Sequence, residues 1–190
     1  MIIIAGTQRS GTTFLSKCFI DAGYDLGSNL FHEDINGGYE SDAALWWANN
    51  KIDNFPFTGY TPVPSKFTEI NKISFLMPVP GILASFINEL NIVAKWIILK
   101  RDFEDVVNSK QSKPRFKKDH PLLRQSAEEL EGYFNDSLHI LEVLNQEVLI
   151  IDFDYLNECG EDVFNFTGID IRKQINKNYD KSKINSWKKD

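Results

Sequence analysis

The stretch Ile2-Ile3-Ile4-Ala5-Gly6-Thr7-Gln8-Arg9-Ser10-Gly11-Thr12-Thr13-Phe14-Leu15 decides the fold. It begins with an apolar run typical of a buried strand, passes through a loop with two glycines, and ends in residues that start a helix. This order is typical of a phosphate-binding loop, because glycines let backbone N–H groups approach an anion and the helix points its positive end at the same place. The stretch therefore predicts an anion site between the strand and the helix.

The loop differs from that of the nucleoside triphosphatases at one position. Their motif carries a lysine directly after the second glycine, whereas this chain has Thr12 there and has its cation, Arg9, inside the loop. A loop without that lysine is poorly suited to a β/γ-phosphate pair. A cation within the loop still suits a shorter anionic group.

Residues 8–13 resemble the loop of sulfotransferases that use 3′-phosphoadenosine-5′-phosphosulfate (PAPS). That family motif reads Pro-Lys/Arg-Ser-Gly-Thr-Thr/Ser, and here glutamine replaces the proline. The resemblance implies PAPS as the cofactor. It also implies that the 5′-phosphosulfate is bound by Gln8, Arg9, Ser10, Gly11, Thr12 and Thr13.

A second motif agrees with the first. The apolar run Trp96–Leu99 leads to Arg101, and Ser109 follows eight positions later. In the family, an arginine at this strand end and a serine at this spacing hold the 3′-phosphate, so the resemblance implies that role for both residues. A guanidinium suits phosphate because it is planar and permanently charged. A surface ion pair of Arg101 with a neighbouring acid is the alternative.

Residues 148–156 and 162–169 resemble the late strand of the family and the short helix after it. Four apolar residues followed by Asp152 are also typical of a strand that holds magnesium. Sulfuryl transfer from PAPS needs no metal, so we expect structural roles for Asp152 and Asp154 and no metal cofactor.

Transfer of a sulfuryl group to an acceptor requires a general base. Gly38-Tyr39-Glu40 resembles the segment that supplies a glutamate base in some relatives, with one residue missing, and we expect Tyr39 to pack inward. His32 competes for the role because the pKa of an imidazole suits proton abstraction near neutrality. Lys66, at the end of an expected strand, is a candidate catalytic cation or else a solvated lysine.

The alternation of short apolar strands with helices predicts a three-layer α/β/α domain around a parallel sheet. The resemblance implies the P-loop sulfotransferase fold. Ligands bind at the carboxyl ends of such strands, where Arg9 and Arg101 are expected to meet. The expected strands are 2–5, 62–67, 93–99 and 148–152; the expected helices are 11–22, 81–90, 103–111, one starting at 126, and one ending at 168.

Composition narrows the class of protein. The 190 residues, 42% hydrophobic and 25% charged, predict a single domain over 1–190, and a net charge of −6 argues against a general nucleic-acid binder. Two cysteines make neither a disulfide framework nor a metal site, and Cys18 is expected to be a buried thiol. With no leader before Ile2 and no apolar run of membrane-spanning length, we expect a cytoplasmic protein without a membrane partner.

The expected activity is transfer of a sulfuryl group from PAPS to a hydroxyl or amine. Aromatic residues between positions 46 and 75 slightly favour a carbohydrate or a small metabolite as the acceptor, although they also suit a core. A P-loop small-molecule kinase and a catalytically inactive PAPS- or nucleotide-binding module are the alternatives. The basic stretch 110–118 is expected to be a solvated loop or a lid.

Overall fold

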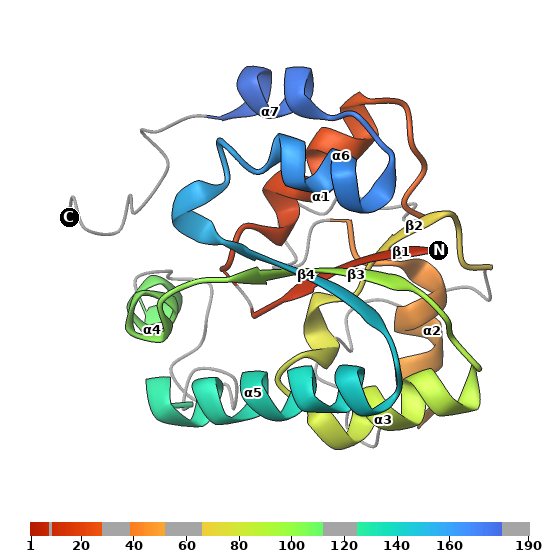
Figure 1. Ribbon diagram of the computed structural model, residues 1–190. Helices are drawn as coiled ribbons and strands as arrows, with labels where there is room; N and C mark the ends of the chain where they lie inside the picture. Colours follow the sequence, from red (N-terminus) through yellow and green to blue (C-terminus); the bar gives the residue numbers. More distant parts are fainter. Residues whose placement is uncertain (8, 28–38, 52–65, 112–124, 180–190) are drawn as a thin grey trace.

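The computed structural model describes residues 1–7, 9–27, 39–51, 66–111 and 125–179 (Figure 1). Its strands are β1 (Ile2–Gly6), β2 (Ile70–Lys72), β3 (Lys95–Lys100) and β4 (Glu147–Asp152). Its helices are α1 (Thr12–Asp21), α2 (Asp42–Lys51), α3 (Pro80–Glu89), α4 (Phe103–Gln111), α5 (Ala127–Val143), α6 (Gly160–Thr167) and α7 (Arg172–Asn178). Two 3₁₀ turns, η1 (Ser74–Leu76) and η3 (Phe153–Tyr155), follow β2 and β4.

The four described strands form one parallel sheet in the order β2-β1-β3-β4. β1 lies inside the sheet, and its last residue, Gly6, is paired with Leu99 of β3. Because all strands run the same way, their carboxyl ends meet at one edge, together with the loop after β1 and the start of α4. The expected α/β class with a parallel central sheet is confirmed.

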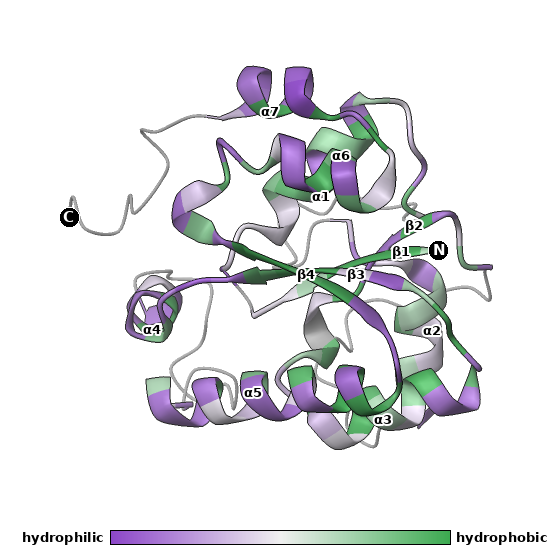
Figure 2. Ribbon diagram, in the orientation of Figure 1, coloured by the Kyte–Doolittle hydropathy of each residue, from purple (hydrophilic) through white to green (hydrophobic). Residues whose placement is uncertain are grey.

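Helices cover both faces of the sheet, which gives three layers (Figure 1). α1, α6 and α7 lie on one face, α2, α3 and α5 lie on the other, and α4 lies beyond the end of β3. Alternate residues of β1 serve the two cores: Ile4 packs with Phe19 of α1, and Ile3 packs in the cluster that contains Phe134 of α5. Figure 2 shows largely apolar stretches of β1, β3 and β4 at the centre, between helices in which hydrophobic and hydrophilic residues alternate.

Most expected elements occur within a few residues of their sequence-based bounds. The Ser126–Glu129 capping box expected for the long helix is present at the start of α5. Gly168, in the left-handed region at φ 79°, ends α6 as expected. Helices α2 and α7 were not expected from the sequence.

The second strand was placed wrongly. It was expected at 62–67, but the paired strand is the later β2, whose Ile70 pairs with Ile2. Residues 62–65 lie outside the described part of the chain, and Lys66 and Phe67 precede β2. The short β2 has no apolar pattern, because its other two residues, Asn71 and Lys72, are polar and yet buried.

Two further expectations concern the interior and the membrane. Cys18 is a buried free thiol as expected, and so is Cys159. Trp47 packs edge-to-face on Phe86 with ring centroids 5.0 Å apart, so this aromatic belongs to the core. No helix in the described ranges is long and apolar enough to cross a bilayer.

Candidate functional site

The loop between β1 and α1 requires both of its glycines. A Cβ on Gly6 would lie 2.4 Å from the carbonyl oxygen of Leu99, because the loop leaves the sheet directly over β3. Gly11 has φ 95°, in the left-handed region that favours glycine, and a Cβ there would lie 2.6 Å from Cδ1 of Leu156. The glycines seen in the sequence therefore serve close packing and backbone conformation.

Hydroxyl side chains organise the rest of this loop. The buried Ser10 hydroxyl donates to the carbonyl oxygen of Thr7 at 2.6 Å and closes the turn from within. Thr12 is buried and Thr13 is exposed at the start of α1. Gly11 is the N-cap and offers no side chain to the first turn, whose N–H groups lack partners within the helix. Gln8 lies outside the described residues.

Arg9 connects the loop to the segment after β3. Its Nε donates to Oγ of Ser109 at 3.2 Å, across 100 positions of sequence. Its carbonyl oxygen accepts a hydrogen bond from Nη1 of Arg101 at 2.8 Å. Arg9 itself has φ 70°, a left-handed conformation that is uncommon for a residue with a side chain. The structure thus brings together the three residues that the two motifs singled out.

Arg101 is held on several sides. Its guanidinium lies 4.3 Å from the ring centroid of Phe153, and its Nη2 lies 4.0 Å from a carboxylate oxygen of Asp105. Only 6% of Arg101 is exposed, and this burial lowers the pKa of its guanidinium from the ordinary value. An arginine remains charged despite such a change, so Arg101 places a fixed positive charge beside the loop.

Acidic groups lie on the β4 side of Arg101. A hollow of about 210 Å³ opens between the ends of β3 and β4, and four carboxylates line it together with Arg101. The four are Asp102, Asp105, Asp152 and Asp154. These carboxylates would repel a phosphate, whereas Arg101 also contacts the loop through the carbonyl oxygen of Arg9. The alternative expected from the sequence, an ion pair of Arg101 with a neighbouring acid, is present only as the long 4.0 Å contact with Asp105.

A lysine that the sequence reasoning missed completes the site. Lys72, the last residue of β2, is only 1% exposed, and its Nζ donates to Oγ1 of Thr13 at 3.2 Å. The same Nζ lies 3.1 Å from Oε1 of Glu40. A second strand end therefore delivers an ammonium group to the first turn of α1, where the lysine of a nucleoside triphosphatase loop is absent.

Glu40 is the buried partner of this lysine. Its Oε2 accepts the backbone N–H of Ser74 at 3.0 Å, and its Oε1 also accepts the Ser74 hydroxyl. The next residue, Ser41, donates its N–H to the carbonyl oxygen of Lys72, so the segment runs alongside β2. Tyr39 has φ 70° and packs against the apolar cluster above the sheet, as expected, which turns Glu40 toward the lysine.

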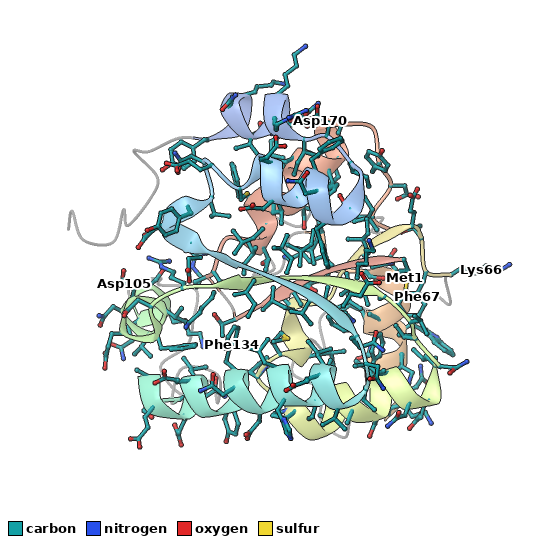
Figure 3. All side chains as sticks on the ribbon, in the orientation of Figure 1. Met1, Lys66, Phe67, Asp105, Phe134 and Asp170 are labelled. Carbon is teal, nitrogen blue, oxygen red and sulfur yellow. The ribbon has the colours of Figure 1, made fainter. Side chains whose placement is uncertain are left out.

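Two other candidates do not join this group. Lys66 is exposed and lies before β2, and Figure 3 shows it on the same side of the molecule as Met1, where β1 begins, with Asp105 on the opposite side. The expectation that Lys66 ends a strand at the site is therefore wrong, because the strand begins after it. His32 lies outside the described residues.

The sequence carried one unused signal for Lys72. The triplet Ile70-Asn71-Lys72, with two polar residues, occurs shortly before the apolar helix segment 80–89, in the place where a βα unit needs a strand. Its polarity hid it, because a buried strand in a parallel sheet is normally apolar. Lys72 can be predicted as a cation at a strand end only if residues 70–72 are first recognised as a strand.

No family model matches the chain, and no curated protein matches it at a significant level. Within the described ranges, no group of three or more His, Cys, Asp or Glu side chains is placed to hold a metal ion.

The described residues form a site suited to an extended anion. Arg9, Lys72 and Arg101 place three positive charges around a helix start, and Thr13 and Ser109 add hydroxyl groups. These charges are local, because the chain as a whole carries a net charge of −6. A helix start flanked by cations binds phosphate or sulfate groups.

Proposed function

We propose that this protein is a sulfotransferase that moves a sulfuryl group from PAPS to a hydroxyl or amine of a small or carbohydrate acceptor. The observation that carries the proposal is the contact of Arg9 with both Ser109 and Arg101. Two motifs that resemble separate parts of one cofactor site meet at the edge of the sheet where parallel α/β proteins bind ligands.

The residues present fit the anionic ends of PAPS. The loop 6–13 and Arg9 would hold the 5′-phosphosulfate, and Arg101 with Ser109 would hold the 3′-phosphate. Both glycines stand where a Cβ would collide with β3 or with Leu156, so the backbone itself shapes the cradle. PAPS supplies an activated sulfuryl group whose departure leaves negative charge on the bisphosphate.

The protein residues act on that charge by fixed electrostatics. Positive groups placed beforehand where charge develops are a large source of catalysis, because they need no reorganisation during the reaction. Arg9 is fixed at both ends, by its side chain and by its carbonyl oxygen, and Lys72 is fixed by Thr13 and Glu40. The sequence offers two candidates for the general base, Glu40 and His32.

Lys72 also favours a second candidate function, a small-molecule kinase. Thr12 argues against a kinase because it stands where the nucleoside triphosphatase motif has a lysine. The ammonium of Lys72, however, reaches the next residue, Thr13, from another strand. That position suits a phosphate chain as well as a phosphosulfate. The acidic strand ends around Asp152 and Asp154 would then be the place to look for magnesium.

A thermal-shift comparison separates the two functions. Adenosine 3′,5′-bisphosphate should raise the melting temperature of a sulfotransferase without magnesium, and ATP should do so less. The 3′-phosphate is the discriminating group, so adenosine 5′-monophosphate is the matched control ligand. A larger shift with ATP and magnesium than with the bisphosphate would contradict the sulfotransferase proposal.

Transfer itself requires a separate assay. Incubation with PAPS carrying a radiolabelled sulfuryl group and a panel of sugars, phenols and amines should give labelled product with at least one acceptor class. Binding of the bisphosphate with no transfer to any acceptor would favour the inactive binding module instead.

A further inference from the structure

The buried pair of Lys72 and Glu40 links the anion loop to a carboxylate. The ammonium of Lys72 contacts Thr13 at the start of α1 on one side and Glu40 on the other, at 3.2 and 3.1 Å. Lys72 is 1% exposed and Glu40 is 6% exposed, so water screens their attraction little. Any anion at the loop therefore meets a lysine whose charge is already offset.

The carboxylate of Glu40 is arranged as an acceptor for donors of the protein. Oε2 accepts the Ser74 N–H, while Oε1 accepts the Ser74 hydroxyl and the Lys72 ammonium. Protein donors thus take three of the roughly four acceptor positions of the carboxylate, and only 6% of Glu40 is exposed, so little of it is open to an acceptor molecule. Protonation of Glu40 would also leave the buried charge of Lys72 without its carboxylate partner, which is costly in a dry site.

We infer that Glu40 is a positioning residue for Lys72 and not the general base. Glu40 holds the ammonium against Thr13 and offsets its charge, which limits the affinity of the loop for anions and speeds their release. This inference rests on the proposed function in one respect, that an anionic ligand binds at the loop. It deepens that function by assigning Glu40 to control of cofactor affinity.

The inference predicts an unusual gain of affinity. Glu40→Gln keeps the size of the side chain and its acceptor for the Ser74 N–H, but it removes the negative charge of Glu40 from the side of Lys72. The affinity for adenosine 3′,5′-bisphosphate should rise about tenfold or more, a change that corresponds to about 1.4 kcal/mol. The rise should appear mainly as a slower dissociation rate.

A double-mutant cycle identifies Lys72 as the intermediary. Lys72→Met should weaken binding of the bisphosphate about tenfold or more, and adding Glu40→Gln to Lys72→Met should recover part of this loss. The gain from Glu40→Gln should be smaller without Lys72 than with it. Glu147→Gln, which removes the same charge at the opposite edge of the sheet, should leave affinity unchanged and serves as the control.

The experiment is isothermal titration of these variants with adenosine 3′,5′-bisphosphate and, separately, with inorganic pyrophosphate, together with transfer rates. Unchanged affinity in Glu40→Gln with turnover reduced 100-fold or more would overturn the inference and favour Glu40 as the base. If Glu40→Gln does not fold, an unchanged affinity of Lys72→Met for both ligands would overturn it as well.

The two ligands separate failure of the inference from failure of the proposed function. If the native protein binds pyrophosphate but not the bisphosphate, the PAPS assignment fails, and the cycle measured with pyrophosphate still decides the role of Glu40. If neither ligand binds the native protein or Glu40→Gln, the loop is no anion site and both proposals fall.

Discussion

Replacement of Arg101 by alanine tests the cofactor site most directly. The change removes a charged donor to the Arg9 carbonyl at 2.8 Å and a guanidinium that lies 4.3 Å from the centre of the Phe153 ring. A hydrogen bond from a charged group contributes about 1.5–3 kcal/mol, and a partly desolvated cation–π contact about 0.5–2 kcal/mol. The free energy of unfolding should therefore fall by roughly 2–5 kcal/mol, measured by chemical denaturation.

The effect of Arg101→Ala on binding should be at least as large. Removing one partner of a desolvated charge contact costs about 2–5 kcal/mol, so the affinity for adenosine 3′,5′-bisphosphate should fall roughly 30-fold to several thousandfold. Two controls separate charge from fold. Lys100→Ala removes an exposed neighbouring cation and should change affinity little, and Phe153→Leu removes the ring beneath the guanidinium while keeping the charge.

Isothermal titration decides the matter. Unchanged affinity in Arg101→Ala would refute the assignment of the 3′-phosphate to this residue and leave Arg101 as a structural clamp on the loop. An equal loss of affinity in Phe153→Leu and Arg101→Ala would indicate that loop geometry, and not the charge of Arg101, controls binding.

Three further predictions concern metal, backbone and pH. Transfer activity should survive EDTA, because the proposed charges come from protein side chains; complete loss restored by magnesium would favour the kinase. Gly11→Ala should lower the free energy of unfolding by about 1–3 kcal/mol or more, since φ 95° strains alanine and its Cβ would meet Leu156; denaturation equal to the native protein would contradict this. Burial lowers the pKa of Lys110 to about 8, so the unfolded chain binds more protons between pH 8 and about 10, and stability should rise with pH in that window. The free energy of unfolding of Lys110→Met, measured by urea denaturation, should rise less with pH than that of the native protein. Identical pH profiles for the two proteins would count against this prediction.

Lys110 also corrects an expectation from the sequence. It was counted with a basic stretch expected to be a solvated loop or a lid, yet it is buried in the last turn of α4. Its neighbours in sequence, from Ser112 to Arg124, lie outside the described residues. A run of basic residues does not reveal which of them falls on the inner face of a helix.

The sequence was sufficient for the parts of the site that are local. The loop of residues 6–13 and the spacing from Arg101 to Ser109 are short patterns, and the structure places both at the carboxyl edge of the sheet. Apolar strands such as β1 and β3 were recognisable because their buried residues are continuous. The same reasoning found the capped start of α5 from two residues three positions apart.

The parts that failed depend on contacts between distant segments. Lys72 is buried in a three-residue strand that also contains the polar Asn71, and its carboxylate partner Glu40 comes from another segment. Helix α2 presents mostly small residues to the core, such as Ala44 and Ala48, and gave no strong helical period. Neither the burial of Lys72 nor helix α2 can be predicted from the sequence without knowing which segments contact each other.

The hydrogen bonds of Arg9 with Ser109 and Arg101 have a consequence for folding during synthesis. The loop lies within the first dozen residues, but the groups that hold Arg9 belong to residues 101 and 109. Contacts between such distant positions are slow to form, because a long stretch of chain must close first. A fragment of residues 1–51 would contain the whole loop motif and still lack both holds on Arg9. During synthesis, the binding edge would therefore be completed only after α4 has left the ribosome and packed against the sheet.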